Sequence, residues 1–327
     1  MTIGVLKEPA HETRVSLLSE LVPSLLKKGV TVLVESGAGE KAFCSNAAYE
    51  NAGAQIKSRS EVLAAADIVL SIFQPDPSEI DRLKSKVIIG VFQPLFNVEE
   101  MKSWAVKGLT TFSLDMLPRT TRAQAMDVLS SQANIAGYKA VLTAANLYSR
   151  YFPMFMTAAG SIKPAKVLIL GAGVAGLQAI ATAKRLGAVV EVFDTRPAVK
   201  EEVMSLGAKF VEVEGAADSS KAGGYAVEQT EEYKQKQQQK IADSIAKADI
   251  VITTAQVPGE KAPILITEEM IKAMRNGSVI IDIAAATGAA TRYALHAWLA
   301  RVIQKARNKK KNLGQFDRNL LSQNFLR

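Results

Sequence analysis

The chain has 327 residues, 48% of them hydrophobic, and a formal net charge of +8. This length suggests about two domains with sizeable cores. The single cysteine, Cys44, excludes an internal disulfide framework, and one cysteine with two histidines makes a zinc site implausible, so we expect no metal. We also expect no membrane span and no secretory signal, because no apolar run approaches roughly 18 residues and the N-terminus has no basic region before an apolar one.

The positive charge is concentrated in the C-terminal segment. Residues 284–327 hold nine Lys or Arg and one Asp, whereas the preceding residues hold 31 basic and 31 acidic side chains. A basic tail can bind nucleic acid or anionic lipid. A charge run of this kind is more often a solvated appendage, so we expect no nucleic-acid partner, with the tail as the only hint of one.

The first 150 residues alternate strand and helix patterns. Helical stretches such as 17–28 and 62–66 separate five short apolar, β-branched runs, which read IGVLKE, VTVLVE, DIVLSIF, VIIGVF and TTFSLDM. This alternation predicts a parallel sheet with helices on both faces. Pro118 interrupts the pattern, and a long helix over about 122–151 is expected to connect this first lobe, 1–150, to the next.

The most informative stretch is residues 165–194. It contains Gly171, Gly173 and Gly176 in G-x-G-x-x-G spacing, between an apolar run and a helical pattern. In a dinucleotide-binding turn the first glycine permits the tight bend, the second lets the backbone approach a pyrophosphate, and the third lets the helix pack closely on the strand. The free N–H groups and positive end of the helix then face the phosphates.

An acidic residue completes this fingerprint. Asp194 lies 18 residues after Gly176, at the end of the second predicted strand. A carboxylate there accepts hydrogen bonds from the ribose hydroxyls of an adenosine and repels a 2′-phosphate, which favours NAD(H) over NADP(H). Arg196 is close enough to weaken that preference. The alternative, a glycine-rich turn that binds nothing, fits less well because the strand, helix, strand and acid are all present.

The rest of the second lobe continues in the same style. Helices are predicted at 174–186, 198–206 and 231–248, and strands at 166–170, 189–193, 209–213, 250–254 and 279–283. A loop of small and polar residues, GAADSSKAGGYAVEQ, has the character of a lid. The predicted fold class is therefore α/β, with two Rossmann-like lobes of parallel sheet joined by a long helix and a nucleotide cleft between them.

Several motifs together resemble one family. They are KEPAHETRV, ESGAGEKAFCSNAAYENAGAQI, PRTTRAQAMDVLSSQANIAGYKA, the glycine-rich stretch, GGYA, TTAQVPGEKAP and GSVIIDIA. They resemble the NAD(H)-binding component, domain I or alpha subunit, of proton-translocating NAD(P) transhydrogenase, and less closely its relative alanine dehydrogenase. The resemblance covers about residues 1–284, so we expect a second lobe over 151–284 and an atypical basic tail over 285–327.

The resemblance implies a set of site residues. The loop after the last strand of the first lobe would reach the nicotinamide and its ribose, with Gln124 and Asp127 positioning the ring for hydride transfer and performing no acid–base step. Tyr225 of GGYA would fold over the nucleotide as part of a mobile lid. Together with the fingerprint, the expected cofactor-binding residues are Arg119, Thr120, Thr121, Gln124, Ala125, Met126, Asp127, Ser130, Gly171, Gly173, Val174, Ala175, Gly176, Asp194, Thr195, Arg196, Gly224, Tyr225, Gln237 and Gln256.

Some of these residues have simpler explanations. Asp127 and Ser130 suit helix capping and the first-turn dipole as well as they suit a ligand. Gln256 departs from the family pattern, which usually has an apolar residue at this position. His11, the one histidine outside the tail, is interpreted as a surface turn residue, because no acidic partner is evident in the sequence.

The type of reaction follows from groups that are missing. By the same resemblance, alanine dehydrogenase needs a lysine in the segment matching SIFQP and a histidine in the segment matching VFQPLF, and this chain has neither. Hydride transfer between two nicotinamides needs no such acid. The resemblance therefore implies that NADH bound here passes hydride to NADP+ on a partner domain, coupled to proton translocation.

The implied assembly contains a transhydrogenase membrane domain, an NADP(H)-binding domain and a second copy of this chain as a homodimer. It would lie at the cytoplasmic face of a bacterial inner membrane, or on the matrix side of a mitochondrial one. Two alternatives stay open: a self-contained NAD-dependent amino- or keto-acid dehydrogenase, and a non-catalytic, truncated NAD-binding protein.

The second alternative rests on the tail, which does not resemble the family. Residues 293–307 have the pattern of a basic amphipathic helix. We expect the closing strands of the second lobe to be missing, with one sheet edge uncovered and the stability lowered.

Overall fold

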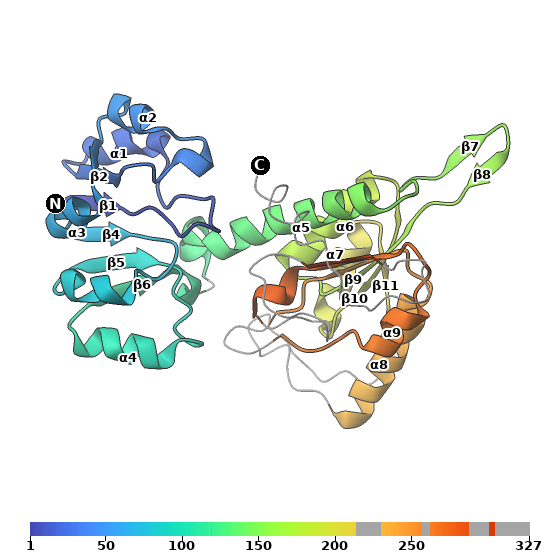
Figure 1. The fold of residues 1–327 in the computed structure, drawn as a ribbon. Coiled ribbons are helices and arrows are strands. Elements are labelled where there is room, and N and C mark those ends of the chain that lie inside the picture. The colour runs from blue at the N-terminus through green and yellow to red at the C-terminus, as the bar shows by residue number, and fades with distance from the viewer. Residues whose placement is uncertain (119, 214–229, 257–261, 288–300, 305–327) are drawn as a thin grey trace, which may run out of the picture. The chain divides into compact units, whose positions relative to one another are not determined.

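A computed structural model describes residues 1–118, 120–213, 230–256, 262–287 and the backbone of 301–304. These residues form two compact α/β units, which divide between Leu129 and Ser130. Each unit contains a largely parallel sheet, as predicted (Figure 1). Within the described ranges, each sheet has six strands where the sequence indicated five, because β3 (Gln55–Lys57) and β14 (Arg301–Gln304) were not predicted. The division into segments 1–150, 151–284 and 285–327 stays a prediction.

The first unit has an entirely parallel sheet in the order β3-β2-β1-β4-β5-β6. Because the chain builds outward from β1 in both directions, a topological switch point lies between β1 and β4. The strands are β1 (Thr2–Val5), β2 (Thr31–Glu35), β3 (Gln55–Lys57), β4 (Ile68–Leu70), β5 (Val87–Gly90) and β6 (Thr110–Ser113).

Short helices cover both faces of this sheet. They are α1 (Val22–Leu26), α2 (Asn46–Asn51), α3 (Arg59–Ala65) and α4 (Val98–Val106). Helices α1 and α2 contribute Val22 and Tyr49 to one buried cluster, and α3 and α4 contribute Val62 and Trp104 to the other. Alternate residues of the strands supply the rest of each cluster, as expected for a sheet buried on both sides.

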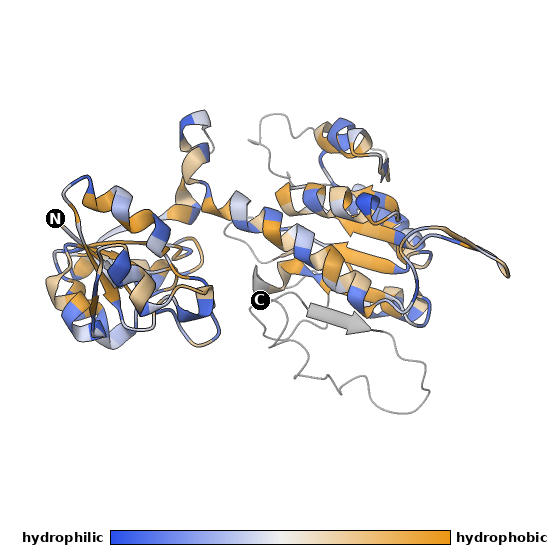
Figure 2. Ribbon diagram, turned by 90° about the horizontal axis from the view of Figure 1, so that it is seen from above, coloured by the Kyte–Doolittle hydropathy of each residue, from blue (hydrophilic) through white to orange (hydrophobic). Residues whose placement is uncertain are grey.

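The second unit has the strand order β11-β10-β9-β12-β13-β14, with β14 antiparallel and the others parallel. Here the switch point lies between β9 and β12. The strands are β9 (Lys166–Leu170), β10 (Val189–Phe193), β11 (Lys209–Phe210), β12 (Ile250–Thr253), β13 (Val279–Asp282) and β14 (Arg301–Gln304). Figure 2 shows how strongly apolar the central strands are, which is typical of strands covered on both faces.

Among the described residues of this unit, five helices cover the second sheet. They are α5 (Val128–Leu147), α6 (Val174–Arg185), α7 (Lys200–Ser205), α8 (Glu231–Ile245) and α9 (Glu268–Ala273). Helices α5, α6 and α7 share one buried cluster with Val167 and Ile169, and α8 and α9 share another with Leu168 and Leu170. Since neighbouring residues of β9 point to opposite faces, the two groups of helices cover opposite faces of the sheet.

Helix α5 packs unusually closely on α6. A Cβ atom at Gly137 would lie 2.1 Å from the Ala175 carbonyl oxygen, and the Asn134 amide donates to Gln178 Oε1 at 3.2 Å. The long helix therefore braces the first turn of α6. Its predicted start at about residue 122 is wrong, because residues 121–126 form a 3₁₀ segment and the α-helix begins at Val128.

Two further expectations need correction. Residues 17–28 form a 3₁₀ turn and the short helix α1, because Pro23 can only occupy the first turn of a helix and Gly29, at φ +75°, ends it. A helix over 293–307 is wrong at 301–304, which form β14 and cover the edge of β13 expected to be open. The other residues of that predicted helix lie outside the described ranges.

A two-stranded hairpin, β7 (Phe155–Thr157) and β8 (Gly160–Ile162), extends from the second unit (Figure 1). It pairs with neither six-stranded sheet. None of the described helices is long and apolar enough to cross a membrane.

Candidate dinucleotide site

The three fingerprint glycines occupy positions with three different steric demands. Gly171 has φ +107°, a conformation that side chains disfavour, so the tight turn after β9 requires glycine. A Cβ atom at Gly176 would lie 2.0 Å from the Gly171 carbonyl oxygen, so only glycine lets α6 approach the strand. At Gly173 a Cβ atom would meet no described residue within 4 Å. The free space at Gly173 is what a pyrophosphate lying against the backbone requires.

The start of α6 is suited to an anion. Gly173 is the N-cap, no side chain caps the helix, and its first turn carries no acidic residue. Val174 is 40% exposed, so the backbone there can be approached. Uncapped N–H groups and the positive end of a 12-residue helix favour a phosphate at this point.

Hydrogen bonds join the loops at the carboxyl ends of β9, β10 and β12. The Gly171 N–H donates to the Phe193 carbonyl at 2.8 Å, and the Thr254 N–H donates to the Leu170 carbonyl at 2.8 Å. The Thr254 hydroxyl also donates to the Gly171 carbonyl at 3.0 Å. The glycine loop is therefore fixed at the switch point, which is where open α/β sheets bind ligands.

Asp194 is tied to that loop. Its Oδ2 accepts from the Ala172 N–H at 2.7 Å, and Ala172 lies between the first two fingerprint glycines. The side chain is nearly buried, and Arg196 forms a forked ion pair with it. The hydrogen bond to Asp194 raises the pKa of Arg196 above its ordinary value, so the guanidinium is always charged. The sequence placed this carboxylate at the expected strand end, and the structure adds its attachment to the glycine turn.

The other expected residues of the second unit lie on α6 and α8 and directly after β10 and β12. Thr195 follows Asp194 directly, and Gln237 is half-buried on α8. The Gln256 amide donates to the Ile283 carbonyl at 3.3 Å, so this side chain is directed toward the end of β13. Ala175 and Val174 form the first turn of α6.

One neighbour of the site was missed. Tyr233 is buried on α8, and burial together with the nearby Asp194 charge raises the pKa of its phenol. It lies one helical turn before Gln237, so the periodicity of α8 could have indicated it.

The remaining expected residues follow β6 in the chain, on either side of the division between the two units. Thr121, Gln124, Ala125 and Met126 are exposed residues of the 3₁₀ segment 121–126, and Thr120 precedes it. The half-buried Asp127 ends this segment, where its N–H donates to the Gln124 carbonyl at 3.2 Å. Half-buried Ser130 lies in the first turn of α5. Their contacts with a cofactor stay predictions, and Arg119, Gly224 and Tyr225 lie outside the described residues.

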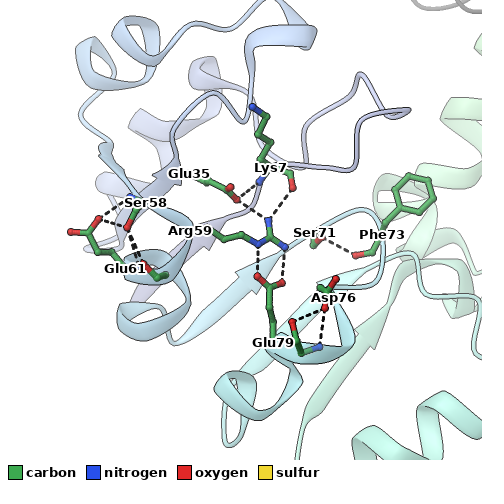
Figure 3. Close-up of polar contacts among 11 residues, drawn as sticks. Lys7, Glu35, Ser58, Arg59, Glu61, Ser71, Phe73, Asp76 and Glu79 are labelled. Atoms are coloured by element: carbon green, nitrogen blue, oxygen red, sulfur yellow. Dashed lines mark hydrogen bonds and ion pairs between the residues drawn. The ribbon is translucent and has the colours of Figure 1, made fainter.

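The segments that lack the dehydrogenase lysine and histidine use their polar groups internally. The Ser71 hydroxyl donates to the Phe73 carbonyl at 2.8 Å (Figure 3), and the Gln74 amide donates to the Phe92 carbonyl at 3.2 Å. The His11 ring packs edge-on against Phe73, with centroids 5.2 Å apart. His11 is an exposed turn residue, in line with its interpretation from the sequence.

Two buried carboxyl groups near these segments were also missed. Glu8 accepts from the N–H groups of Ile72 at 2.6 Å and Phe73 at 3.1 Å, while burial raises its pKa. Burial acts in the same direction on Glu12, but the hydrogen bonds and charge of Arg14 outweigh it and lower the pKa of Glu12. Glu8 joins the loop after β1 to that after β4, and Glu12 holds Arg14. Among the described residues, no cluster of His, Cys, Asp or Glu is arranged to hold a metal.

The fold and the site together define a class: a two-lobed α/β protein with a dinucleotide-binding turn at the switch point of its second sheet. The chain belongs to the alanine dehydrogenase/PNT family. Residues 4–136 match the family's N-terminal domain and residues 140–299 its C-terminal domain.

Transhydrogenases are more similar to the chain than alanine dehydrogenases are. An NAD(P) transhydrogenase subunit alpha protein of Rickettsia prowazekii is 47% identical, with 88% of this chain and 77% of that protein aligned. NAD(P) transhydrogenase subunit alpha of Cereibacter sphaeroides is 45% identical, but the chain spans only 56% of its length. Alanine dehydrogenase of Bacillus subtilis is 29% identical, with 87% of this chain and 70% of that protein aligned.

Solved structures give the same ranking. The crystal structure of transhydrogenase from Sinorhizobium meliloti matches with a TM-score of 0.80 and 46% identity, covering 89% of this chain and 80% of that one. An L-alanine dehydrogenase structure matches with a TM-score of 0.71 and 27% identity, covering 90% of this chain and 76% of that one. The resemblance inferred from the sequence motifs is thereby confirmed.

Proposed function

We propose that this chain is the NAD(H)-binding component of a proton-translocating NAD(P) transhydrogenase. It binds NADH and presents the nicotinamide to NADP+ held by a partner domain, and hydride passes directly between the two rings. The observation that carries the proposal is the glycine turn tied to Asp194 at the switch point of the second sheet. The transhydrogenase relatives support it.

The described residues fit the adenosine half of the cofactor. The open space at Gly173 and the uncapped start of α6 would receive the pyrophosphate. Asp194 would hold the adenosine ribose. Gln124 and Asp127, by family resemblance, would orient the nicotinamide ring. When bound, NADH supplies the hydride, so the chain's task is to bind, orient and exclude water.

A self-contained dehydrogenase is the weaker candidate. Reducing a carbonyl requires a proton donor at the substrate oxygen. In the two strand-end segments where alanine dehydrogenase needs its lysine and histidine, this chain has Phe73, Gln74 and Gln93. The buried acid near them, Glu8, already accepts two backbone hydrogen bonds.

The first experiment measures binding and exchange with the full chain. NADH and NADPH are titrated by nicotinamide fluorescence, and hydride transfer from NADH to an NADP+ analogue is then followed after adding the membrane and NADP(H)-binding components of a transhydrogenase. We expect binding of NADH well ahead of NADPH, and transfer only with the partners present. NADH formation from an amino acid by the chain alone would overturn the proposal, as would tighter binding of NADPH.

We further propose that the chain works with a transhydrogenase membrane domain and an NADP(H)-binding domain. The assembly would lie at the cytoplasmic face of a bacterial inner membrane, or on the matrix side of a mitochondrial one. The names of the relatives, which are subunits of such an enzyme, support this.

We also propose a homodimer that uses the β7–β8 hairpin. An isolated two-stranded hairpin is marginally stable in water, and this one adds exposed apolar side chains: Tyr151, Met154 and Phe155 are each at least 44% exposed, and Met156 is 76% exposed. A second copy of the chain could cover these side chains, as each copy carries the same surface.

The dimer is tested by Met156→Asp, with light scattering after size exclusion as the measurement. We expect the native chain to be dimeric and the variant to dissociate at micromolar concentration. Met204→Asp is the matched control, because Met204 is an exposed methionine on α7. A monomeric native chain, or a Met156→Asp dimer as stable as the native one, would contradict the proposal.

A further inference from the structure

We propose that Arg196 is a latent binding group for an adenosine 2′-phosphate, kept out of use by Asp194. The selectivity for NAD(H) over NADP(H) then depends on the Asp194–Arg196 ion pair, and not on the carboxylate alone. This inference rests on the proposed NAD(H) site and deepens it.

The geometry of the pair is a fork. Asp194 Oδ1 accepts from Arg196 Nε at 2.9 Å, and Oδ2 accepts from Arg196 Nη2 at 2.8 Å. The Arg196 backbone N–H donates to Oδ1 at 2.8 Å, and the Ala172 N–H donates to Oδ2 at 2.7 Å. A carboxylate offers about four acceptor positions. All four are therefore filled, and a ribose diol can bind only by displacing the guanidinium.

The fork also changes the electrostatics of the site. The Asp194 and Arg196 side chains are only 6% and 19% exposed, so their charges offset each other at close range with little solvent between them. While the pair is intact, repulsion of a phosphate by Asp194 is largely cancelled. Discrimination between NAD(H) and NADP(H) must then depend on whether the cofactor can replace the hydrogen bonds that Arg196 donates to Asp194.

NADH can make that exchange. Its two ribose hydroxyls can replace the two guanidinium N–H donors, while the N–H groups of Ala172 and Arg196 keep the carboxylate in place. NADPH offers one hydroxyl and a phosphate, which brings an anion to the carboxylate. The guanidinium would suit that phosphate, since its planar fork matches phosphate and carboxylate alike. In the native chain, however, the Arg196 guanidinium donates its hydrogen bonds to Asp194.

The consequence concerns the proposed reaction. A transhydrogenase must hold NAD(H) and NADP(H) in different sites, because two NADP(H) molecules facing each other would exchange hydride without net reaction. Asp194 would exclude NADP(H) from this site in two ways, by accepting from the ribose and by engaging the neighbouring cation at the strand end. The inference predicts that removing the carboxylate creates an NADP(H) site from residues already present.

The test compares NADH and NADPH dissociation constants in the full chain and its variants. In Asp194→Asn the side-chain oxygen can still accept from the Ala172 N–H, but the amide cannot form the ion pair with Arg196. We expect NADPH binding to tighten at least tenfold relative to the native chain, with a steeper salt dependence, and NADH binding to weaken. In Asp194→Asn/Arg196→Gln the gain in NADPH affinity should disappear.

A second substitution at Asp194 and a matched control complete the design. Asp194→Ser also removes the carboxylate, with a smaller side chain, and should show the same gain in NADPH affinity. It keeps the test usable if Asp194→Asn folds poorly. Asp249→Asn frees Arg275 from a single, more exposed ion-pair contact at 3.3 Å. Like Asp194, Asp249 also accepts from a backbone N–H, but it lies just before β12, at the opposite end of the strands, so this variant should gain no NADPH affinity.

The outcomes separate this inference from the proposed function. A native chain that binds no NADH overturns both. A native chain that binds NADH, with no gain of NADPH affinity in either Asp194 variant, overturns only the role of Arg196. A gain that persists after Arg196→Gln also overturns it.

Discussion

Replacing Gly173 by alanine is expected to weaken NADH binding about 100-fold, or about 2.7 kcal/mol, while leaving the fold intact. The backbone at Gly173 is extended, with φ −80°, and a Cβ atom there would meet nothing within 4 Å in the part of the chain that the structure describes. The native chain therefore tolerates a methyl group. A pyrophosphate lying against this backbone does not, because the methyl group would occupy its place.

Gly176→Ala is the matched comparison, because it should lower the stability of the fold, which Gly173→Ala leaves unchanged. Its Cβ atom would lie 2.0 Å from the Gly171 carbonyl oxygen, so α6 or the loop must shift. Overpacking of this kind costs about 1 to 3 kcal/mol, and here it involves rigid backbone. We expect a loss of thermal stability in Gly176→Ala and an unchanged melting temperature in Gly173→Ala.

Calorimetry and NADH titration of the two variants together separate binding from folding. Gly173→Ala with native NADH affinity would show that no phosphate approaches this turn. Gly176→Ala with native stability would show that the helix does not depend on the close contact.

Much of the second unit was predictable because its signals are local. All five parallel strands described in this unit begin where they were predicted, at Lys166, Val189, Lys209, Ile250 and Val279. Most of them are largely apolar runs bounded by polar or turn residues. Buried parallel strands have this composition regardless of what packs on them. The roles of the three glycines were equally accessible, because each role depends on backbone geometry that the spacing fixes.

Two of the errors arose where tertiary contacts decide the local structure, whereas the error at 17–28 came from the local signals of Pro23 and Gly29. Periodicity continues through residues 122–147, but only Val128–Leu147 form the α-helix, braced on α6 through Gly137. At 301–304 an amphipathic pattern suggested helix, yet the backbone pairs with β13, which offers an unpaired edge. A sequence window contains no information about such an edge.

The features of the site also fall into those set by local spacing and those set by the folded structure. The position of Asp194 follows from the length of a strand–helix–strand unit, so the sequence could place it. Its engagement by Arg196 depends on a turn in which residue 196 folds back on residue 194, and spacing alone does not specify that turn. Tyr233 joins the site only because α8 packs on that edge of the sheet.

Arg59→Met is expected to destabilise the first unit by about 2 kcal/mol, because breaking a partly buried ion-pair network leaves carboxylates with little solvent access uncompensated. Arg59 donates to both oxygens of Glu79, at 2.6 and 2.8 Å, and to Glu35 at 2.9 Å (Figure 3). It also donates to the Lys7 carbonyl at 3.1 Å. One side chain therefore links the loop after β1, the end of β2, the start of α3 and the 3₁₀ helix at 77–83.

Urea unfolding of the full chain, with hydrogen exchange of the β1 and β2 amides, measures the effect in the first unit. Arg82→Met is the control, since Arg82 is exposed, and it should change stability by less than about 0.5 kcal/mol. Arg59→Met/Glu79→Leu should recover part of the loss, because the unpaired carboxylate goes while Glu35 keeps the Lys7 N–H as a donor at 2.8 Å. Equal stability of Arg59→Met and the native chain would mean that this network is dispensable and that apolar packing alone fixes the carboxyl edge of the first sheet.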